Sequence, residues 1–165
     1  MLKTNGFTLV EILIVMLIVS IMMGVVVTSI PSSMDSADQE TEAQRIRTVL
    51  QMASDEAVIS GFEIGFNAVS SRYNFYQFDD DTLKWQPLDD RPFEEHILPA
   101  GLSLDLEVEG SEMELGDALT APPVLILSSG EVTPFSLSVT MDDSETPGLV
   151  VSTDGFSEFK LDREQ

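Results

Sequence analysis

The sequence predicts an α+β protein in which a long N-terminal α-helix packs on an antiparallel β-sheet system. Three observations lead to this prediction. Residues 7–61 are first uniformly apolar and then amphipathic with helical spacing. Residues 62–165 contain short alternating segments separated by polar turns, which is typical of strands. The length of 165 residues allows one globular domain with an appendage.

Composition restricts the function classes. The formal net charge is −21, from 29 acidic and 8 basic residues, and contact with nucleic-acid phosphates requires Lys and Arg. We therefore expect no nucleic-acid partner. The chain has no cysteine and only one histidine, His96, which disfavours thiolate sites, histidine-based metal sites and catalytic triads. We expect no enzyme activity, no catalytic residue, no metal and no cofactor.

The apolar N-terminal segment has the length of a membrane span. Residues 12–30 are 19 residues without a charge, 15 of them strongly apolar, and a helix of about 20 apolar residues crosses a bilayer core. Lys3 precedes this run and the residues that follow are strongly acidic, so we expect a cytoplasmic N-terminus and an external C-terminal part. A cleaved secretory signal fits poorly, because the run is long and no small-x-small site follows it.

A specific pattern precedes the apolar run. A short polar leader containing Lys3 is followed by Gly6, Phe7 and Glu11. This pattern resembles the cleavage and methylation site of type IV prepilins and of the pseudopilins of type II secretion. The resemblance implies that a prepilin peptidase in the inner membrane removes the leader, residues 1–6, and N-methylates Phe7 with S-adenosylmethionine. It also implies that residues 7–30 form a transmembrane helix that becomes the filament core.

Glu11 is the one charge at the start of this helix, and its position suggests a role in subunit assembly. Phe7 and Glu11 are four residues apart and therefore lie on one helix face. In stacked subunits Glu11 can meet the terminal amine of a neighbouring chain, and either charge alone in apolar surroundings is unfavourable. Judged without the resemblance, Glu11 could instead be a carboxylate tolerated at the level of the lipid headgroups.

Two further features concern helix packing. Ser20, Gly24 and Thr28 repeat every four residues, and small residues at this spacing allow helices to approach closely in lipid; chance occurrence explains them equally well. Pro31 lacks an N–H and clashes with the carbonyl of Val27, so we expect a kink there. One bent helix and two helices joined near residues 31–36 both remain open.

Residues 31–61 continue the helix in amphipathic form, and Gly61 is the expected C-terminal stop. The apolar stripe is expected to comprise Ala43, Ile46, Val49, Leu50, Ala53, Ala57 and Val58. The opposite, polar face is expected to comprise Glu40, Glu42, Gln44, Arg47, Gln51, Ser54 and Asp55.

The β-rich globular part, residues 62–165, is expected to contain six to eight strands. They are predicted at 62–66, 73–78, 83–86, 102–108, 124–127, 135–141, 149–152 and 156–160, the last two flanking the hairpin signal Asp154-Gly155. Residues 110–121 lack a period and are expected to form a surface loop. The acidic pairs and triplets, such as 79–81, lack the spacing of a calcium loop and are expected to be solvated turns.

Several stretches resemble one branch of the pseudopilins. Residues 43–46 and 50–57 with Gly61, and residues 85–87, 98–102 and 129–135, are similar to the H-type minor pseudopilins of type II secretion (general secretion pathway protein H). The resemblance implies a pilin-like fold, with a β-sandwich over the second half of the helix, in the inner membrane and the periplasm. It implies a structural subunit that joins a tip complex of I-, J- and K-type minor pseudopilins to a shaft of the G-type major pseudopilin, with an inner-membrane assembly platform as a further partner.

Two alternatives remain at this level. The first is a minor pilin of a type IV pilus, which would share the leader and the fold. The second is a periplasmic binding domain anchored in the membrane, which would never polymerise and would not need Gly6 or Glu11.

Overall fold

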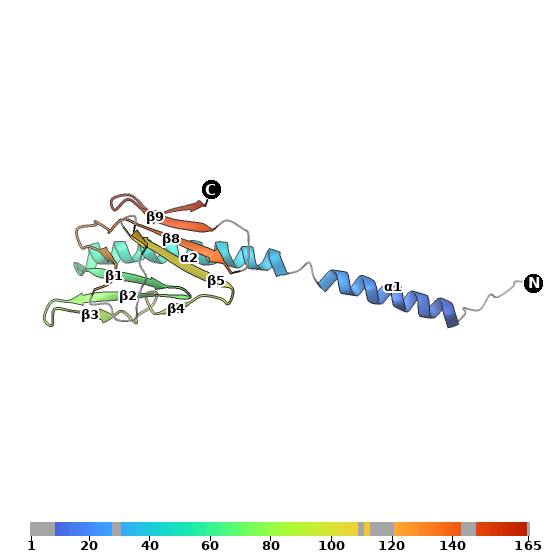
Figure 1. The fold of residues 1–165 in the computed structure, drawn as a ribbon. Coiled ribbons are helices and arrows are strands. Elements are labelled where there is room, and N and C mark those ends of the chain that lie inside the picture. The colour runs from blue at the N-terminus through green and yellow to red at the C-terminus, as the bar shows by residue number, and fades with distance from the viewer. Residues whose placement is uncertain (1–8, 28–30, 109–110, 113–120, 143–147, 165) are drawn as a thin grey trace, which may run out of the picture. The chain divides into compact units, whose positions relative to one another are not determined.

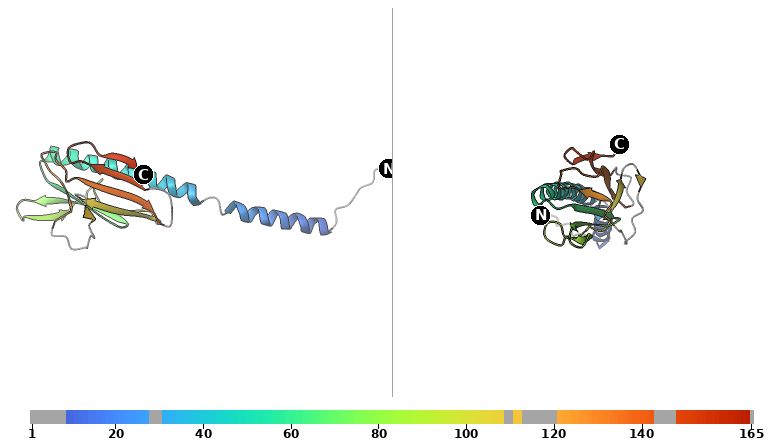
Figure 2. Two further views of the ribbon diagram at one scale, coloured as in Figure 1. Left: turned by 45° about the horizontal axis from the view of Figure 1, so that its top comes forward. Right: turned by 90° about the vertical axis from the view of Figure 1, so that its left-hand side faces the viewer.

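The computed structural model describes residues 9–27, 31–108, 111–112, 121–142 and 148–164, without the side chains of residues 21–36 and 111–112. The chain divides into two compact units, Met1–Asp35 and Ser36–Gln165. The elements of both units can be followed in Figure 1, and Figure 2 gives two further views.

The first unit contains the helix α1 (Leu9–Val27). Its large apolar side chains from Leu9 to Val19 are between 45% and 82% exposed. They surround the helix instead of forming a stripe, because the sequence offers no polar face there. Among the residues that the structure describes, no helix is both long enough and apolar enough to cross a membrane.

The helix α2 (Pro31–Ser60) follows, and from Ser36 onward it belongs to the second unit. Pro31 occupies the first helical position, where its missing N–H costs no intrahelical hydrogen bond. Gly61 ends α2 in the left-handed region, with φ +74°, and its N–H donates to the carbonyl of Ala57 at 3.0 Å. The predicted stop is therefore confirmed. Residues 31–36, where the two-helix arrangement placed its joint, are helical and belong to α2, and residues 28–30 lie outside the described residues.

The predicted apolar stripe of α2 is confirmed with one exception. Its members from Ala43 to Ala57 are buried, whereas Val58 is 52% exposed, because it follows Ala57 by a rotation of 100° and lies at the margin of the stripe. The predicted polar face also has one exception. Glu42 is only 8% exposed, because its carboxylate is held against His96.

Two antiparallel sheets form the rest of the second unit. The first has the order β3-β2-β1-β7, with β4 also paired to β2; the second has the order β10-β9-β8-β5-β6. The strands of the first sheet are β1 (Ile64–Val69), β2 (Arg72–Asp79), β3 (Lys84–Pro87), β4 (His96–Ile97) and β7 (Val124–Ile126). Those of the second are β5 (Leu102–Val108), β6 (Ser111–Glu112), β8 (Phe135–Met141), β9 (Leu149–Thr153) and β10 (Lys160–Arg163).

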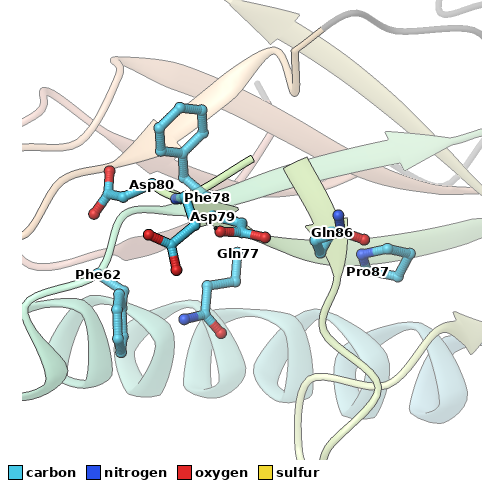
Figure 3. Close-up of a pocket in the computed structure, with 8 residues that line it drawn as sticks. Phe62, Gln77, Phe78, Asp79, Asp80, Gln86 and Pro87 are labelled. Atoms are coloured by element: carbon cyan, nitrogen blue, oxygen red, sulfur yellow. Dashed lines mark hydrogen bonds between the residues drawn. The ribbon is translucent and has the colours of Figure 1, made fainter. Parts of the chain in front are cut away.

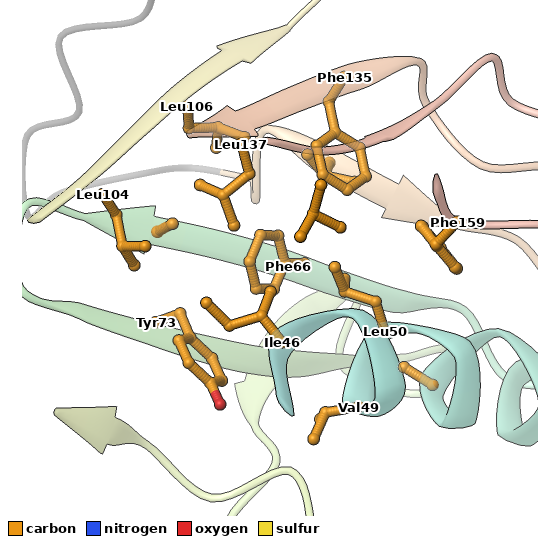
Figure 4. Packing of buried hydrophobic residues seen from close by; sticks show 14 of the residues in the cluster. Ile46, Val49, Leu50, Phe66, Tyr73, Leu104, Leu106, Phe135, Leu137 and Phe159 are labelled. Carbon is orange, nitrogen blue, oxygen red and sulfur yellow. The ribbon is translucent and has the colours of Figure 1, made fainter. Parts of the chain in front are cut away.

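One hydrophobic core joins α2 to both sheets. Figure 4 shows Ile46 and Leu50 of α2 beside Phe66 of β1, with Leu137 of β8 close by. The ring centroids of Phe66 and Phe135 lie 6.1 Å apart, so aromatic contacts connect the two sheets. The backbone also connects them, since the N–H of Leu104 donates to the carbonyl of Ser70 at 2.7 Å. This architecture is the expected α+β fold, a helix packed on antiparallel sheets.

The strand predictions were accurate where alternation was clean. Residues 102–108 and 135–141 form β5 and β8 with the predicted bounds. The first strand begins at Ile64, two residues later than predicted, because residues 61–63 lead out of the helix cap. The last strand is Lys160–Arg163 and not 156–160, because residues 155–157 form the turn that Asp154 stabilises.

Two short strands were not predicted. His96–Ile97 forms β4, and Ser111–Glu112 forms β6 within the segment expected to be a loop. Two residues are too few to show the alternation of a strand. These two segments form strands because they pair with β2 and β5, respectively, and the sequence does not reveal that pairing. Residues 113–120, most of the expected loop, lie outside the described residues.

Candidate functional site

The candidate assembly site begins in α1. Gly6 and Phe7, the predicted cleavage and methylation residues, lie outside the described residues. Glu11 is the third residue of α1 and lies in its first turn. A carboxylate in the first turn interacts favourably with the unpaired N–H groups and the positive end of the helix dipole. This position lets a charge be accommodated at the start of a helix that is otherwise apolar.

The predicted packing face of α1 is described only in part. Ser20 lies on α1, and its Oγ donates to the carbonyl of Met16 at 2.8 Å, so its hydroxyl is satisfied within the helix. Gly24 follows one turn later in the same helix, and Pro31 opens α2. Thr28 lies outside the described residues. Ser20 and Gly24 thus present two small residues at the spacing that close helix packing uses.

The surface of α1 has a clear energetic consequence. Moving an exposed Leu, Ile, Val or Met side chain into apolar surroundings stabilises by about 1.5–3 kcal/mol. Ten such side chains, from Leu9 to Val19, are exposed on this helix. Transfer of α1 into an apolar phase or a bundle of other helices would therefore be strongly favourable. The charged carboxylate of Glu11 opposes this transfer unless a positively charged partner is present.

In the second unit, the least expected polar contact lies between α2 and β4. The Nε2 atom of His96 and the Oε2 atom of Glu42 are 2.9 Å apart, and both side chains are largely buried. The ring centroids of Tyr73 and His96 lie 5.2 Å apart, with the two ring planes tilted by 45°. Burial raises the pKa of the Tyr73 phenol, an effect that the neighbouring Arg45 partly offsets. These contacts fasten a two-residue edge strand to the helix, which is a structural role.

Of the acidic turns expected to be solvated, residues 80, 81, 89, 90 and 142 are exposed, Asp79 is half-buried, and residue 143 lies outside the described residues. Asp79 accepts hydrogen bonds from the backbone N–H groups of Asp81 and Thr82 and from the hydroxyl of Thr82, which lower the pKa of its carboxyl. Asp154 has the same arrangement with Phe156 and Ser157, again with a lowered pKa. Among the described residues no group of three His, Asp or Glu side chains is placed to hold a metal ion.

Sequence reasoning missed the contact between Glu42 and His96, which are 54 positions apart. Glu42 lies on the predicted polar face of α2, and no local pattern marks it as buried. The one available signal was its position beside Ala43 and Ile46, at the border of the apolar stripe. Burial of Glu42 depends on where β4 pairs, which sequence spacing does not reveal.

The sequence matches two described families. A family described as "Type II transport protein GspH" matches residues 42–155, more than half of the chain. A family described as "Prokaryotic N-terminal methylation motif" matches residues 1–27, the segment that contains Gly6, Phe7 and Glu11. Among curated relatives, the type II secretion system protein H of Pseudomonas aeruginosa is 32% identical over 162 residues, which cover 93% of this chain and 92% of the relative.

Solved structures agree with the fold. The minor pseudopilin EpsH from the type 2 secretion system of Vibrio cholerae has a TM-score of 0.63 and 30% identity, covering 76% of this chain and 97% of that chain. The type IV minor pilin FimU of Pseudomonas aeruginosa has a TM-score of 0.54 and 15% identity, covering 78% of this chain and 90% of that chain. The likeness to FimU shows the fold alone.

The family match decides between the alternatives that the sequence left open. It begins at residue 42 within α2 and ends at the turn at Gly155, so it includes most of the buried core residues and every described strand except β10. Together with the N-terminal methylation motif, it indicates a membrane-anchored periplasmic protein. The chain belongs to the GspH family of type II transport proteins and is a minor pseudopilin of the type II secretion system, a structural subunit and not an enzyme.

Proposed function

We propose that this minor pseudopilin links a tip complex of I-, J- and K-type minor pseudopilins to a shaft of the G-type major pseudopilin, and so supports export of folded proteins across the outer membrane. The observation that carries the proposal is the division of the chain into two different units. One is an apolar helix with a single carboxylate in its first turn, and the other is a compact β-rich domain.

The first step in the proposed pathway is processing by a prepilin peptidase. It cuts between Gly6 and Phe7 and methylates the new terminal amine. Intact mass and peptide mass spectrometry of the protein from native membranes tests this step. We expect residues 1–6 to be missing and Phe7 to carry an N-methyl group. Gly6→Ala should block cleavage, whereas Asn5→Ala, one position away, should not. An intact Met1 or a cut after residue 30 in the native protein would contradict the proposal.

In the proposed topology, residues 7–30 cross the inner membrane with the N-terminus in the cytoplasm and the β-rich domain in the periplasm. The natural absence of cysteine allows single-cysteine reporters. We expect a membrane-impermeant maleimide to label Ser129→Cys in intact spheroplasts and to leave Thr4→Cys unlabelled in the Gly6→Ala background, which retains the leader. The opposite labelling would reverse the topology.

Glu11 is proposed to pair with the methylated amine of the neighbouring subunit during assembly. Removal of the carboxylate should leave membrane insertion intact and reduce incorporation into filaments. The comparison is Glu11→Gln against Glu40→Gln, which neutralises an exposed carboxylate on α2. Equal incorporation of both variants, measured in sheared filament fractions, would show that Glu11 has no assembly role.

The position between tip and shaft is tested by cross-linking in cells. In α1, Ser20→Cys should form disulfide-linked or bismaleimide-linked products with cysteine variants of the G-type subunit and of at least one tip subunit. Ser20 is suitable because it lies in α1 and, with Gly24 one turn later, belongs to the packing face proposed for this helix. Products with the G-type subunit alone would place the protein within the shaft, and products with the inner-membrane assembly platform alone would indicate that it never leaves that platform.

A further inference from the structure

The second unit has a groove at the C-terminal end of α2, against β2 and β3. Two pockets, of about 360 Å³ and about 310 Å³, share Phe62 and Gln77 as wall residues, so they lie on either side of these two side chains. Figure 3 shows the lining of the first pocket, with Gln77 on the side of the strands that faces α2 and Phe62 beside α2. Phe62 is 46% exposed, although it follows directly after the helix cap at Gly61.

The two pockets differ in chemistry. The first is lined by the acidic turn 79–81 together with the rings of Phe62 and Pro87. The second has an apolar floor, formed by Ile64, Leu88 and Phe93, of which Ile64 and Phe93 are buried in the core. The first pocket therefore suits a cation on an apolar stem, and the second suits an apolar side chain.

The charge of the groove is one-sided. Five carboxylates line it. The single cation among the lining residues is Arg91, whose strongly exposed side chain has its Nε atom 3.4 Å from the Oε1 atom of Glu94. The carboxylates are those of Glu56, Asp79, Asp80, Asp81 and Asp90. Hydrogen bonds from Thr82 hold the pKa of Asp79 below its ordinary value, so this carboxyl is charged at neutral pH. An acidic segment would be repelled here, and a basic one attracted.

We propose that this groove docks an extended segment of a partner protein that carries a Lys or Arg two residues from an apolar side chain, with the basic residue in the acidic pocket and the apolar residue over Ile64, Leu88 and Phe93. Alternate side chains of an extended segment point in the same direction, and the two pockets share Phe62 and Gln77, so one extended segment can place a side chain in each pocket. The inference rests on the groove alone and does not depend on the position between tip and shaft proposed above.

The test measures binding of a defined probe to the full chain in detergent. The probe is a blocked peptide, Gly-Gly-Lys-Gly-Phe-Gly-Gly, compared with peptides in which Glu replaces Lys or Gly replaces Phe. The groove variant is Asp80→Asn/Asp81→Asn. The matched control is Asp105→Asn/Glu107→Gln, which removes the same charge from exposed positions of β5 in the other sheet. Unfolding midpoints of both variants confirm that each remains folded.

We expect the peptide with Lys and Phe to bind, and the groove variant to weaken binding about tenfold relative to the control variant. Each replacement peptide should also bind at least several times more weakly, and Phe62→Ala should reduce discrimination between Phe and Gly in the peptide. Backbone amide signals of residues 61, 62 and 77 should shift on titration. Equal weakening in the two charge variants would show attraction by net charge only, and absence of binding would show that the groove is no docking site; either result overturns the proposal.

Discussion

The two helices of this chain carry apolar residues in opposite ways. In α1 these residues surround the helix, and from Leu9 to Val19 all the large ones are exposed. In α2 they form a stripe, and its members from Ala43 to Ala57 are buried against the two sheets. Apolar side chains of α2 therefore stabilise the fold of the second unit, whereas those of α1 remain free to contact lipid or other proteins.

This contrast teaches which residues stabilise the domain and which serve assembly. A side chain that is already buried contributes to the free energy of unfolding, whereas an exposed apolar side chain contributes only after transfer into lipid or a helix bundle. Substitutions at equivalent residue types in the two units should therefore affect different measurements.

The largest expected difference comes from the same substitution in each helix. Leu50→Ala removes a fully buried side chain from the core and should destabilise the second unit by about 2–5 kcal/mol. Leu13→Ala changes a 62% exposed side chain of α1 and should alter the unfolding of the second unit by less than about 0.5 kcal/mol. Urea denaturation in detergent, followed by the fluorescence of Trp85, measures both. A comparable loss in the two variants would break the contrast.

A smaller difference is expected for two carboxylates of α2 itself. Glu42→Ala leaves the largely buried His96 without its partner and should cost about 1–3 kcal/mol. Glu40→Ala, two residues earlier, removes an exposed side chain and should change stability by about 0.5 kcal/mol or less. Denaturation at pH 7 compares the pair. If both variants were as stable as the wild type, the contact between α2 and β4 would be energetically unimportant.

These examples also show how far the sequence could predict the molecule. Regular spacing predicted the stripe of α2, and clean alternation predicted β5 and β8, because both patterns are local and repeat over several residues. The stop at Gly61 was predictable because a left-handed cap favours glycine.

What could not be predicted depends on partners distant in sequence. The edge strand β4 has two residues, and its position is decided by pairing with β2 and by the contact between His96 and Glu42. The groove beside Phe62 arises where the end of α2, β2 and β3 meet, and no periodicity indicates such a junction. By contrast, the sequence alone was enough to select Glu11 as a candidate assembly residue, because the pattern around it consists of residues that are neighbours in the sequence.

The third difference concerns two glycines. Replacement by alanine should destabilise the protein at Gly61 and stabilise the helix at Gly24. Gly61→Ala forces a Cβ into a backbone with φ +74° and should destabilise by about 1 kcal/mol, although the space around it is open. Gly24→Ala lies within α1 and should favour the helix by about 0.5–1 kcal/mol. Thermal unfolding by circular dichroism measures both effects.

Gly24→Ala also separates helix stability from assembly. If Gly24 belongs to a close-packing face with Ser20, the variant should form fewer filaments despite its more stable helix. Normal filament formation by Gly24→Ala would show that the small residues of α1 have no packing role, which is the alternative that chance occurrence predicts.

The smallest expected effect is a pH dependence at the turn before β10. The carboxylate of Asp154 accepts hydrogen bonds from Phe156 and Ser157, which hold its pKa below the ordinary value of 3.8. Its charged form is therefore favoured in the folded state. The stabilisation is fully present above the ordinary value and is lost as the pH falls through the lower pKa of the folded protein.

Asp154→Asn isolates this contribution, because the amide oxygen can still accept from the backbone while the charge is absent. We expect the variant to be slightly less stable than the wild type between pH 5 and 7, with the difference in unfolding midpoint shrinking as the pH falls below 3.8. The sign is diagnostic, since a strained or repelled carboxylate would give a variant that is more stable near neutral pH and loses that advantage in acid. A difference independent of pH would mean that the turn depends on the geometry of the acceptor and not on its charge.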